Sequence, residues 1–135
     1  MPETSIIVRT FNEEKYFQRL LEGIRAQDYT DYEIINVDSG STDLTPSIAA
    51  QYCDKVVRIK SADFTFGYSL NEGIRASQGR YIVCVSAHTE PTTEQWLGNL
   101  VEPFHDESTA MVYGRQFGGP ESWFSECTDL AREFG

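Results

Sequence analysis

Three short runs with apolar centres constrain the fold of this chain more than any other feature. They cover residues 5–9, 32–38 and 81–86 and are rich in β-branched side chains. Apolar runs of this length, without strict alternation, are typical of strands that are buried on both faces of a parallel sheet. We predict two further strands, at residues 55–59 and 110–113, and we expect the most apolar run, 81–86, to be central.

Segments with helical spacing lie between these runs. Asn12 is predicted to cap a helix that carries two acids in its first turn and a buried stripe of Phe17, Leu20, Leu21 and Ile24. Thr45 followed by Pro46 is a typical helix start. Further helices are expected at residues 70–77, with Gly79 as C-cap, at 92–101 from a capping box, and at 122–134. The order of elements predicts an α/β fold with a mostly parallel central sheet and helices on both faces.

Size, charge and cysteines narrow the functional classes. A chain of 135 residues with 40% apolar and 13% aromatic residues is expected to form one folded domain. The formal net charge of −10 argues against a nucleic-acid binder and a polybasic membrane module, but it does not exclude a nucleotide ligand. No signal peptide or membrane-spanning stretch is visible, and three widely spaced cysteines do not suggest a disulfide framework. We therefore expect a cytoplasmic protein.

Polar residues follow three of the predicted strands. In open parallel sheets, ligands bind beyond the carboxyl ends of the strands. The segment 38–43 is the most informative, because Gly40 permits a positive φ and the hydroxyls of Ser39 and Ser41 can surround the turn. Asp38 could accept a hydrogen bond from a ribose hydroxyl or a base N–H. It could equally close an Asx turn that caps the next helix, and both interpretations remain open.

Three well-known functional loops are missing from the sequence. No G-x-G-x-x-G follows the first strand, no G-x-x-x-x-G-K-[ST] exists, and no G-x-S-x-G elbow is present. These absences argue against a dinucleotide Rossmann site, a P-loop and an α/β-hydrolase nucleophile, respectively.

Several ordered motifs resemble family 2 glycosyltransferases. They are SIIVRTFNEE at residues 5–14, EIINVDSGSTD at 33–43 and NEGIRASQGRY at 71–81. The triplet SAH at 86–88, with Pro91 and YGRQ at 113–116, is similar to a rhamnosyltransferase-type subgroup. The resemblance implies a GT-A fold and inverting transfer of a sugar from a nucleotide-diphosphate donor, such as a UDP- or dTDP-sugar, to an acceptor hydroxyl in glycan or polysaccharide synthesis.

The resemblance also implies a set of nucleotide-binding residues. Base and ribose would be lined by residues of the first strand end, and Asp38 would contact the nucleoside. The residues implied to bind the nucleotide are Thr10, Phe11, Asn12, Glu13, Asp38, Ser39, Gly40, Asn71, Gly73, Arg75, Ser86 and Ala87. Arg75, Arg80 or a divalent cation could neutralise the charge that grows on the diphosphate leaving group.

The triplet Ser86-Ala87-His88 departs from the family. The common pattern at this place is Asp-x-Asp, whose second carboxylate binds Mg²⁺ or Mn²⁺ beside the diphosphate. His88 could ligate Mn²⁺, or it could donate a hydrogen bond to the β-phosphate directly. Two alternatives therefore remain: a divalent cation beside the diphosphate, or a direct hydrogen bond from His88 to the phosphate.

Family members have longer catalytic domains than this chain. We therefore expect residues 1–135 to be a single nucleotide-sugar-binding domain that lacks the acceptor-binding part and the carboxylate that deprotonates the acceptor. The expected partners are a nucleotide-diphospho-sugar and a glycan or lipid-linked acceptor, the latter allowing a place at the inner face of the membrane. The alternative is a catalytically incomplete nucleotide-binding or assembly module that could self-associate as a homodimer.

Overall fold

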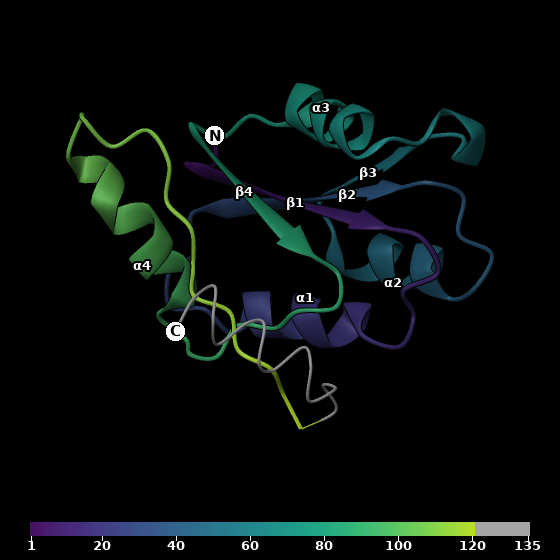
Figure 1. The fold of residues 1–135 in the computed structure, drawn as a ribbon, viewed down its shortest axis with the longest axis horizontal. Helices are drawn as coiled ribbons and strands as arrows, with labels where there is room; N and C mark the ends of the chain where they lie inside the picture. The colour runs from purple at the N-terminus through teal and green to yellow at the C-terminus, as the bar shows by residue number, and fades with distance from the viewer. Residues whose placement is uncertain (121–135) are drawn as a thin grey trace. The chain divides into compact units, whose positions relative to one another are not determined.

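The computed structural model describes residues 1–120, and these fall into two compact units, Met1–Gly98 and the described part of Asn99–Gly135. The first unit contains a four-stranded sheet in the order β3-β2-β1-β4. Its strands are β1 (Thr4–Thr10), β2 (Tyr32–Asp38), β3 (Lys55–Arg58) and β4 (Tyr81–Ser86), and all three pairings are parallel. The predicted α/β class is confirmed (Figure 1).

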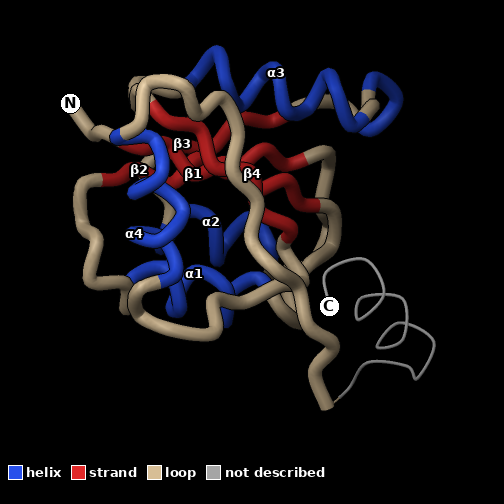
Figure 2. Tube along the Cα trace, turned by 60° about the vertical axis from the view of Figure 1, so that its left-hand side comes forward, coloured by secondary structure: helices blue, strands red, loops and turns tan. Residues whose placement is uncertain are grey.

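Helices cover both faces of this sheet. Helices α1 (Phe17–Arg25) and α2 (Thr45–Tyr52) lie on one face, and α3 (Phe66–Ala76) lies on the other (Figure 2). Helix α4 (Trp96–Val101) spans the boundary of the two units, and short 3₁₀ turns occur at Ser61–Asp63 and Glu102–His105. Within the described part of the chain, no helix has the length and apolar character needed to cross a membrane.

The alternation of side chains along β1 divides the core between the two faces. Ile6 and Val8 pack with the buried stripe of α1, which is the predicted set Phe17, Leu20, Leu21 and Ile24. Ile7 points to the opposite face and packs with Val37 and Ile59 beside Leu70 of α3. All of the strand residues in these two clusters are buried, as expected for inner strands of a covered parallel sheet.

Some predicted boundaries and caps are wrong. Asn12 has φ 51° and is not an N-cap; α1 begins after Tyr16, and Leu44 rather than Thr45 precedes α2. Helix α3 begins at Phe66, four residues earlier than predicted, because the Thr65 side chain accepts a hydrogen bond from the Tyr68 backbone N–H. The C-cap of α3 is Ser77 and not Gly79.

Two strand predictions are wrong, and one helix prediction is not tested by the structure. Residues 110–113 form no strand, and β4 is an edge strand of the described sheet rather than a central one. Alternate side chains of β4 are exposed, so one face of this strand is uncovered. A short apolar run without a pairing partner has no ladder to hold it as a strand. The helix predicted at residues 122–134 lies outside the described residues.

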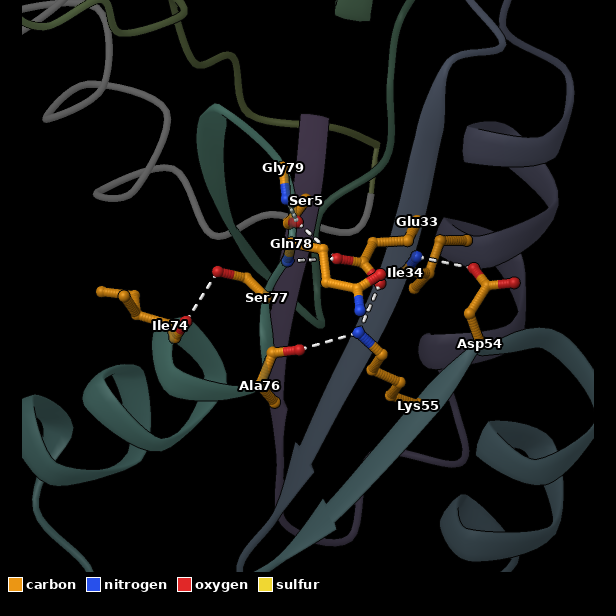
Figure 3. Close-up of polar contacts among 10 residues, drawn as sticks. All are labelled: Ser5, Glu33, Ile34, Asp54, Lys55, Ile74, Ala76, Ser77, Gln78 and Gly79. Carbon is orange, nitrogen blue, oxygen red and sulfur yellow. Dashed lines mark hydrogen bonds and ion pairs between the residues drawn. The ribbon is translucent and has the colours of Figure 1, made fainter. Parts of the chain in front are cut away.

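Gly79 is needed where the chain passes close to the start of β1. Its backbone N–H donates to Ser5 Oγ at 2.8 Å, and a Cβ at this position would lie 2.5 Å from the Ser5 backbone nitrogen (Figure 3). Because backbone is the obstacle, Gly79→Ala is expected to lower the free energy of unfolding by about 1–3 kcal/mol. Chemical denaturation of both forms measures this effect.

Gly67→Ala is the matched control for Gly79→Ala. Gly67 lies in α3, and a Cβ there would meet nothing within 4 Å. Alanine favours helix over glycine by about 1 kcal/mol, so this variant should be as stable as the original chain or more stable. Equal losses in both variants would show that close approach to Ser5 is not the cause.

Candidate functional site

A pocket opens at the carboxyl ends of β1 and β4, beside the residue that follows β2. Side chains from three strand ends and from the segment leading into α3 form its walls. The lining residues are Arg9, Thr10, Phe11, Glu13, Ser39, Phe64, Phe66, Ser86, Ala87 and His88. Seven of the residues predicted for nucleotide or metal binding are thus brought together by the fold. The outermost two, Thr10 and His88, are 78 positions apart in the sequence.

Asp38 organises the turn beside this pocket. Its Oδ1 accepts hydrogen bonds from Thr10 Oγ1 at 2.9 Å and from the Ser41 hydroxyl. Its Oδ2 accepts from the backbone N–H groups of Gly40 at 3.1 Å and Ser41 at 2.9 Å. A carboxylate offers about four acceptor sites, and these contacts occupy that number. Asp38 is buried, so in this structure it closes an Asx-type turn and it is Ser39 that lines the pocket.

The loop after β1 is tied to the loop after β2. Asn12 donates its backbone N–H to Ser41 Oγ at 2.9 Å and accepts from the Thr42 N–H at 2.8 Å. Asp43 accepts from the N–H groups of Thr45 and Glu14. Desolvation alone would raise the pKa of Asp43, but these hydrogen bonds outweigh it and lower the pKa below its ordinary value. The positive φ of Asn12 and of Gly40, 99°, fits both loops to this contact.

His88 is oriented by Glu13. The Nδ1 atom of His88 lies 2.8 Å from Glu13 Oε2, and the ring meets Tyr16 edge-on with centroids 6.4 Å apart. Because a carboxylate only accepts hydrogen bonds, Nδ1 carries the proton in this contact. The Nε2 atom of His88 is therefore the nitrogen that is left to meet a ligand, either as an acceptor in the neutral ring or as a donor in the imidazolium.

The residues around His88 do not provide a complete set of metal ligands. Within residues 1–120, no group of three or more His, Cys, Asp or Glu side chains is placed to hold one ion. Glu13, the nearest carboxylate, is engaged by the imidazole. A cation bound here would need most of its coordination from a ligand's own oxygens and from water, which is the usual situation for Mg²⁺ beside phosphates. The donor set alone does not specify a metal.

Aromatic side chains form the wall on the α3 side. The rings of Phe64 and Phe66 meet edge-to-face with centroids 5.3 Å apart, and the Arg9 guanidinium lies 4.7 Å from the Phe66 centroid. Phe11 adds a further exposed ring at the end of β1. Exposed aromatic rings and the Arg9 guanidinium, next to polar lining residues such as Thr10 and Ser39, suit the stacking of a planar ligand.

The structure does not bring the remaining predicted residues to the pocket. Asn71 is exposed on α3, and Gly73 is buried on the sheet side, where a Cβ would lie 2.6 Å from Ile7 Cγ2. Arg75 forms an ion pair with Glu72 near the end of α3, nine residues or about 14 Å beyond Phe66. Arg80 immediately precedes β4, at the end of the sheet where the strands begin, whereas the pocket lies where they end.

Sequence reasoning missed three pocket residues, namely Arg9, Phe64 and Phe66. Arg9 was available as part of the polar rim after the first strand, but nothing in the local pattern distinguished it from a solvated arginine. Phe64 and Phe66 flank Thr65, whose Thr-Phe sequence is a possible helix start. A helix begun there would have placed both rings at the same edge of the sheet as Asp38.

The fold is an α/β domain with a pocket at the carboxyl ends of its parallel strands, the place where sheets of this kind bind ligands. Residues 5–126 match the family described as glycosyl transferase family 2, and the chain belongs to that family. The structure is similar to the mannosyltransferase PcManGT from Pyrobaculum calidifontis in complex with GDP-Man and Mn²⁺. The TM-score is 0.69 at 27% identity, covering 78% of this chain and 33% of the other. The predicted GT-A fold is thereby confirmed.

One relative agrees with the family assignment, and a further solved structure shares the fold. A dolichyl N-acetyl-alpha-D-glucosaminyl phosphate 3-beta-D-2,3-diacetamido-2,3-dideoxy-beta-D-glucuronosyltransferase from Methanococcus voltae is 35% identical over 107 residues, covering 74% of this chain and 33% of its own length. The crystal structure of Staphylococcus aureus TarS 1–349 in complex with UDP-GlcNAc shares the fold, with a TM-score of 0.65 at 22% identity over 88% of this chain and 39% of the other. The chain thus spans about a third of the length of these relatives.

Proposed function

We propose that this chain is the donor-binding part of an inverting glycosyltransferase, which binds a nucleotide-diphospho-sugar and supports transfer of the sugar to an acceptor hydroxyl in glycan or polysaccharide synthesis. The observation that carries the proposal is the convergence of Thr10, Ser39 and His88, from three separate strand ends, on one aromatic-walled pocket. The family membership of the chain supports the same assignment.

The residues of the pocket suit the successive parts of such a donor. The turn held by Asp38 presents Ser39 and backbone groups to a base or ribose, and the exposed rings offer a stacking surface. His88, oriented through Glu13, can meet a phosphate oxygen or a cation through Nε2. Stabilising the charge on the leaving diphosphate is the main electrostatic demand of the reaction.

The location, the donor sugar and the place of the acceptor site are also proposals. We propose a cytoplasmic protein, acting at the inner face of the membrane when its acceptor is lipid-linked, and rhamnose as the sugar on the strength of the SAH and YGRQ motifs. We further propose that the acceptor site and its catalytic base lie outside these 135 residues, which span about a third of the relatives compared. The chain by itself is then expected to bind donor without transferring sugar.

Titration calorimetry with UDP, dTDP and GDP tests the proposal. One of the three is expected to bind with micromolar affinity. Each titration is run with Mn²⁺ and with EDTA. If a cation bridges His88 and the diphosphate, EDTA weakens binding at least tenfold and His88→Ala removes the dependence on Mn²⁺. If His88 contacts phosphate directly, EDTA has little effect and His88→Ala still weakens binding.

His105→Ala is the matched control, because His105 also pairs with a glutamate, Glu102 at 3.2 Å, but is not among the residues that line the pocket. It should leave nucleotide affinity unchanged under both conditions. Failure of all three nucleotides to bind would overturn the donor-binding proposal and would favour an assembly module of the same fold. In that case sedimentation should show self-association.

A further inference from the structure

Arg9 occupies an unusual position in the pocket. It is the penultimate residue of β1, pairs with Ser86 of β4 and Val37 of β2 in register, and is half-buried. Its Nη1 atom is buried and has no hydrogen-bond partner among the described residues. Because a guanidinium stays protonated, a buried N–H of this group is costly to leave unpaired and is normally satisfied. An acceptor from a bound ligand would remove that cost.

The charges around the pocket indicate the kind of ligand that Arg9 would meet. Arg9 is the only lysine or arginine among the residues that line the pocket, whereas the whole chain carries a formal net charge of −10. The lining carboxylate, Glu13, is paired with His88, and no ion pair joins it to Arg9 in the described part of the chain. Among the described residues the Arg9 guanidinium therefore forms no ion pair with a carboxylate, in a molecule whose net negative charge otherwise repels anions.

Phe66 fixes the orientation of this guanidinium. The guanidinium carbon lies 4.7 Å from the ring centroid, and Phe64 packs against the same ring from its edge. A guanidinium that lies over an aromatic face keeps its planar fork of N–H groups, which can bind a phosphate through two oxygens. Helix α3 begins at Phe66, and the contact with Arg9 places this ring beside the end of β1.

We propose that Arg9, supported by Phe66, binds the diphosphate of the donor; this inference rests on the function proposed above. Arg9 thereby supplies a permanent positive charge at a site whose described residues lack a complete set of metal ligands. The two arginines expected from sequence to neutralise the leaving group, Arg75 and Arg80, do not line the pocket. Arg9 is a binding residue for phosphate and not for the base.

Comparing a nucleoside diphosphate with its nucleoside tests this assignment. UDP and uridine, dTDP and thymidine, or GDP and guanosine are used, according to which diphosphate binds the unaltered chain. Arg9→Gln is expected to weaken the diphosphate at least tenfold, to leave the nucleoside within twofold, and to reduce the salt dependence of diphosphate binding. Arg80→Gln is the matched control, because Arg80 also lies over an aromatic ring, Tyr81, but at the opposite edge of the sheet.

Two further variants keep the test decisive. Arg9→Lys retains the charge without the planar group, so its affinity for the diphosphate should lie between those of the original chain and Arg9→Gln. The lysine variant also serves as the test if the glutamine variant does not fold. Phe66→Leu should weaken the diphosphate moderately and spare the nucleoside. Equal losses of nucleoside and diphosphate in Arg9→Gln, or no loss of either, would overturn the role of Arg9. Absence of any nucleotide binding to the unaltered chain would instead refute the function on which it rests.

Discussion

Asp38→Ala is expected to lower the free energy of unfolding by about 3 kcal/mol and to abolish measurable nucleotide binding. The substitution removes both acceptor atoms of a buried carboxylate and leaves the Thr10 and Ser41 hydroxyls, and the N–H groups of Gly40 and Ser41, without their partner. Unpaired buried donors cost more than the net value of the hydrogen bonds they lose. Urea denaturation and calorimetry with the binding nucleotide measure the two effects.

Binding should fail because the turn, and not a direct contact alone, positions Ser39. Asp38 holds the chain where Ser39 N donates to the Thr10 carbonyl at 3.0 Å and where the Ser61 hydroxyl reaches the Ser39 carbonyl. Asp38→Asn should rescue only part of the loss, because it keeps one acceptor oxygen for the N–H groups of Gly40 and Ser41, whereas its NH₂ group can no longer accept from the Thr10 and Ser41 hydroxyls.

Asp106→Ala is the control for Asp38→Ala. Asp106 also accepts a backbone N–H and a hydroxyl, both from Ser108, but the residue is exposed. Surface substitutions of this kind change stability by about 0.5 kcal/mol or less. A stable Asp38→Ala protein with unchanged nucleotide affinity would contradict both the structural and the functional role of the turn.

The strands were predictable because their signal is local and their environment is uniform. Residues 32–38 and 81–86 have apolar, β-branched centres, and the structure has β2 and β4 at the same residues. The stripe of α1 was predictable for the same reason, since its period fixes one buried face. The run at 110–113 has a similar composition but no partner strand in the structure, and pairing is not a local property.

Helix caps and the far wall of the pocket were less predictable because tertiary contacts decide them. The Asn12 side chain does not cap α1 because it accepts from Thr42, 30 residues away, and it takes a positive φ to do so. The strand-end rule placed Thr10, Ser39 and His88 at one edge correctly. No such rule places Arg9 against Phe66, because that contact depends on where α3 begins and on how it packs against the sheet.

A second polar network lies at the opposite end of the sheet, where the strands begin (Figure 3). Glu33 of β2 is buried there, and its Oε1 accepts from Ser5 Oγ at 2.6 Å and from the Gln78 N–H at 2.7 Å. Its Oε2 lies 2.9 Å from Lys55 Nζ, which also donates to the Ala76 carbonyl at 2.8 Å. This one carboxylate therefore joins β1, β2, β3 and the segment that follows α3.

Glu33→Gln is expected to lower the free energy of unfolding by about 2–4 kcal/mol at pH 7, because it leaves Lys55 without its anion and weakens the bonds from Ser5 and Gln78. Burial alone would raise the pKa of Glu33, but the hydrogen bonds from Ser5, Lys55 and Gln78, together with the charge of Lys55, lower it below its ordinary value of 4.5. Denaturation at several pH values measures both the loss and its pH dependence.

The sign of that dependence follows from the lowered pKa. A carboxyl whose pKa is lower in the folded state stabilises the fold at pH values above its unfolded pKa, and this contribution is lost as the pH falls through the folded pKa. The difference between the original chain and Glu33→Gln should therefore be constant near neutrality and shrink below about pH 4.5. Glu90→Gln is the control, because Glu90 pairs with Arg19 at 2.9 Å on the exposed surface and should matter by less than about 1 kcal/mol. A difference for Glu33→Gln that stays constant down to pH 2 would show that Glu33 stabilises the sheet only as a hydrogen-bonding group and not as an anion.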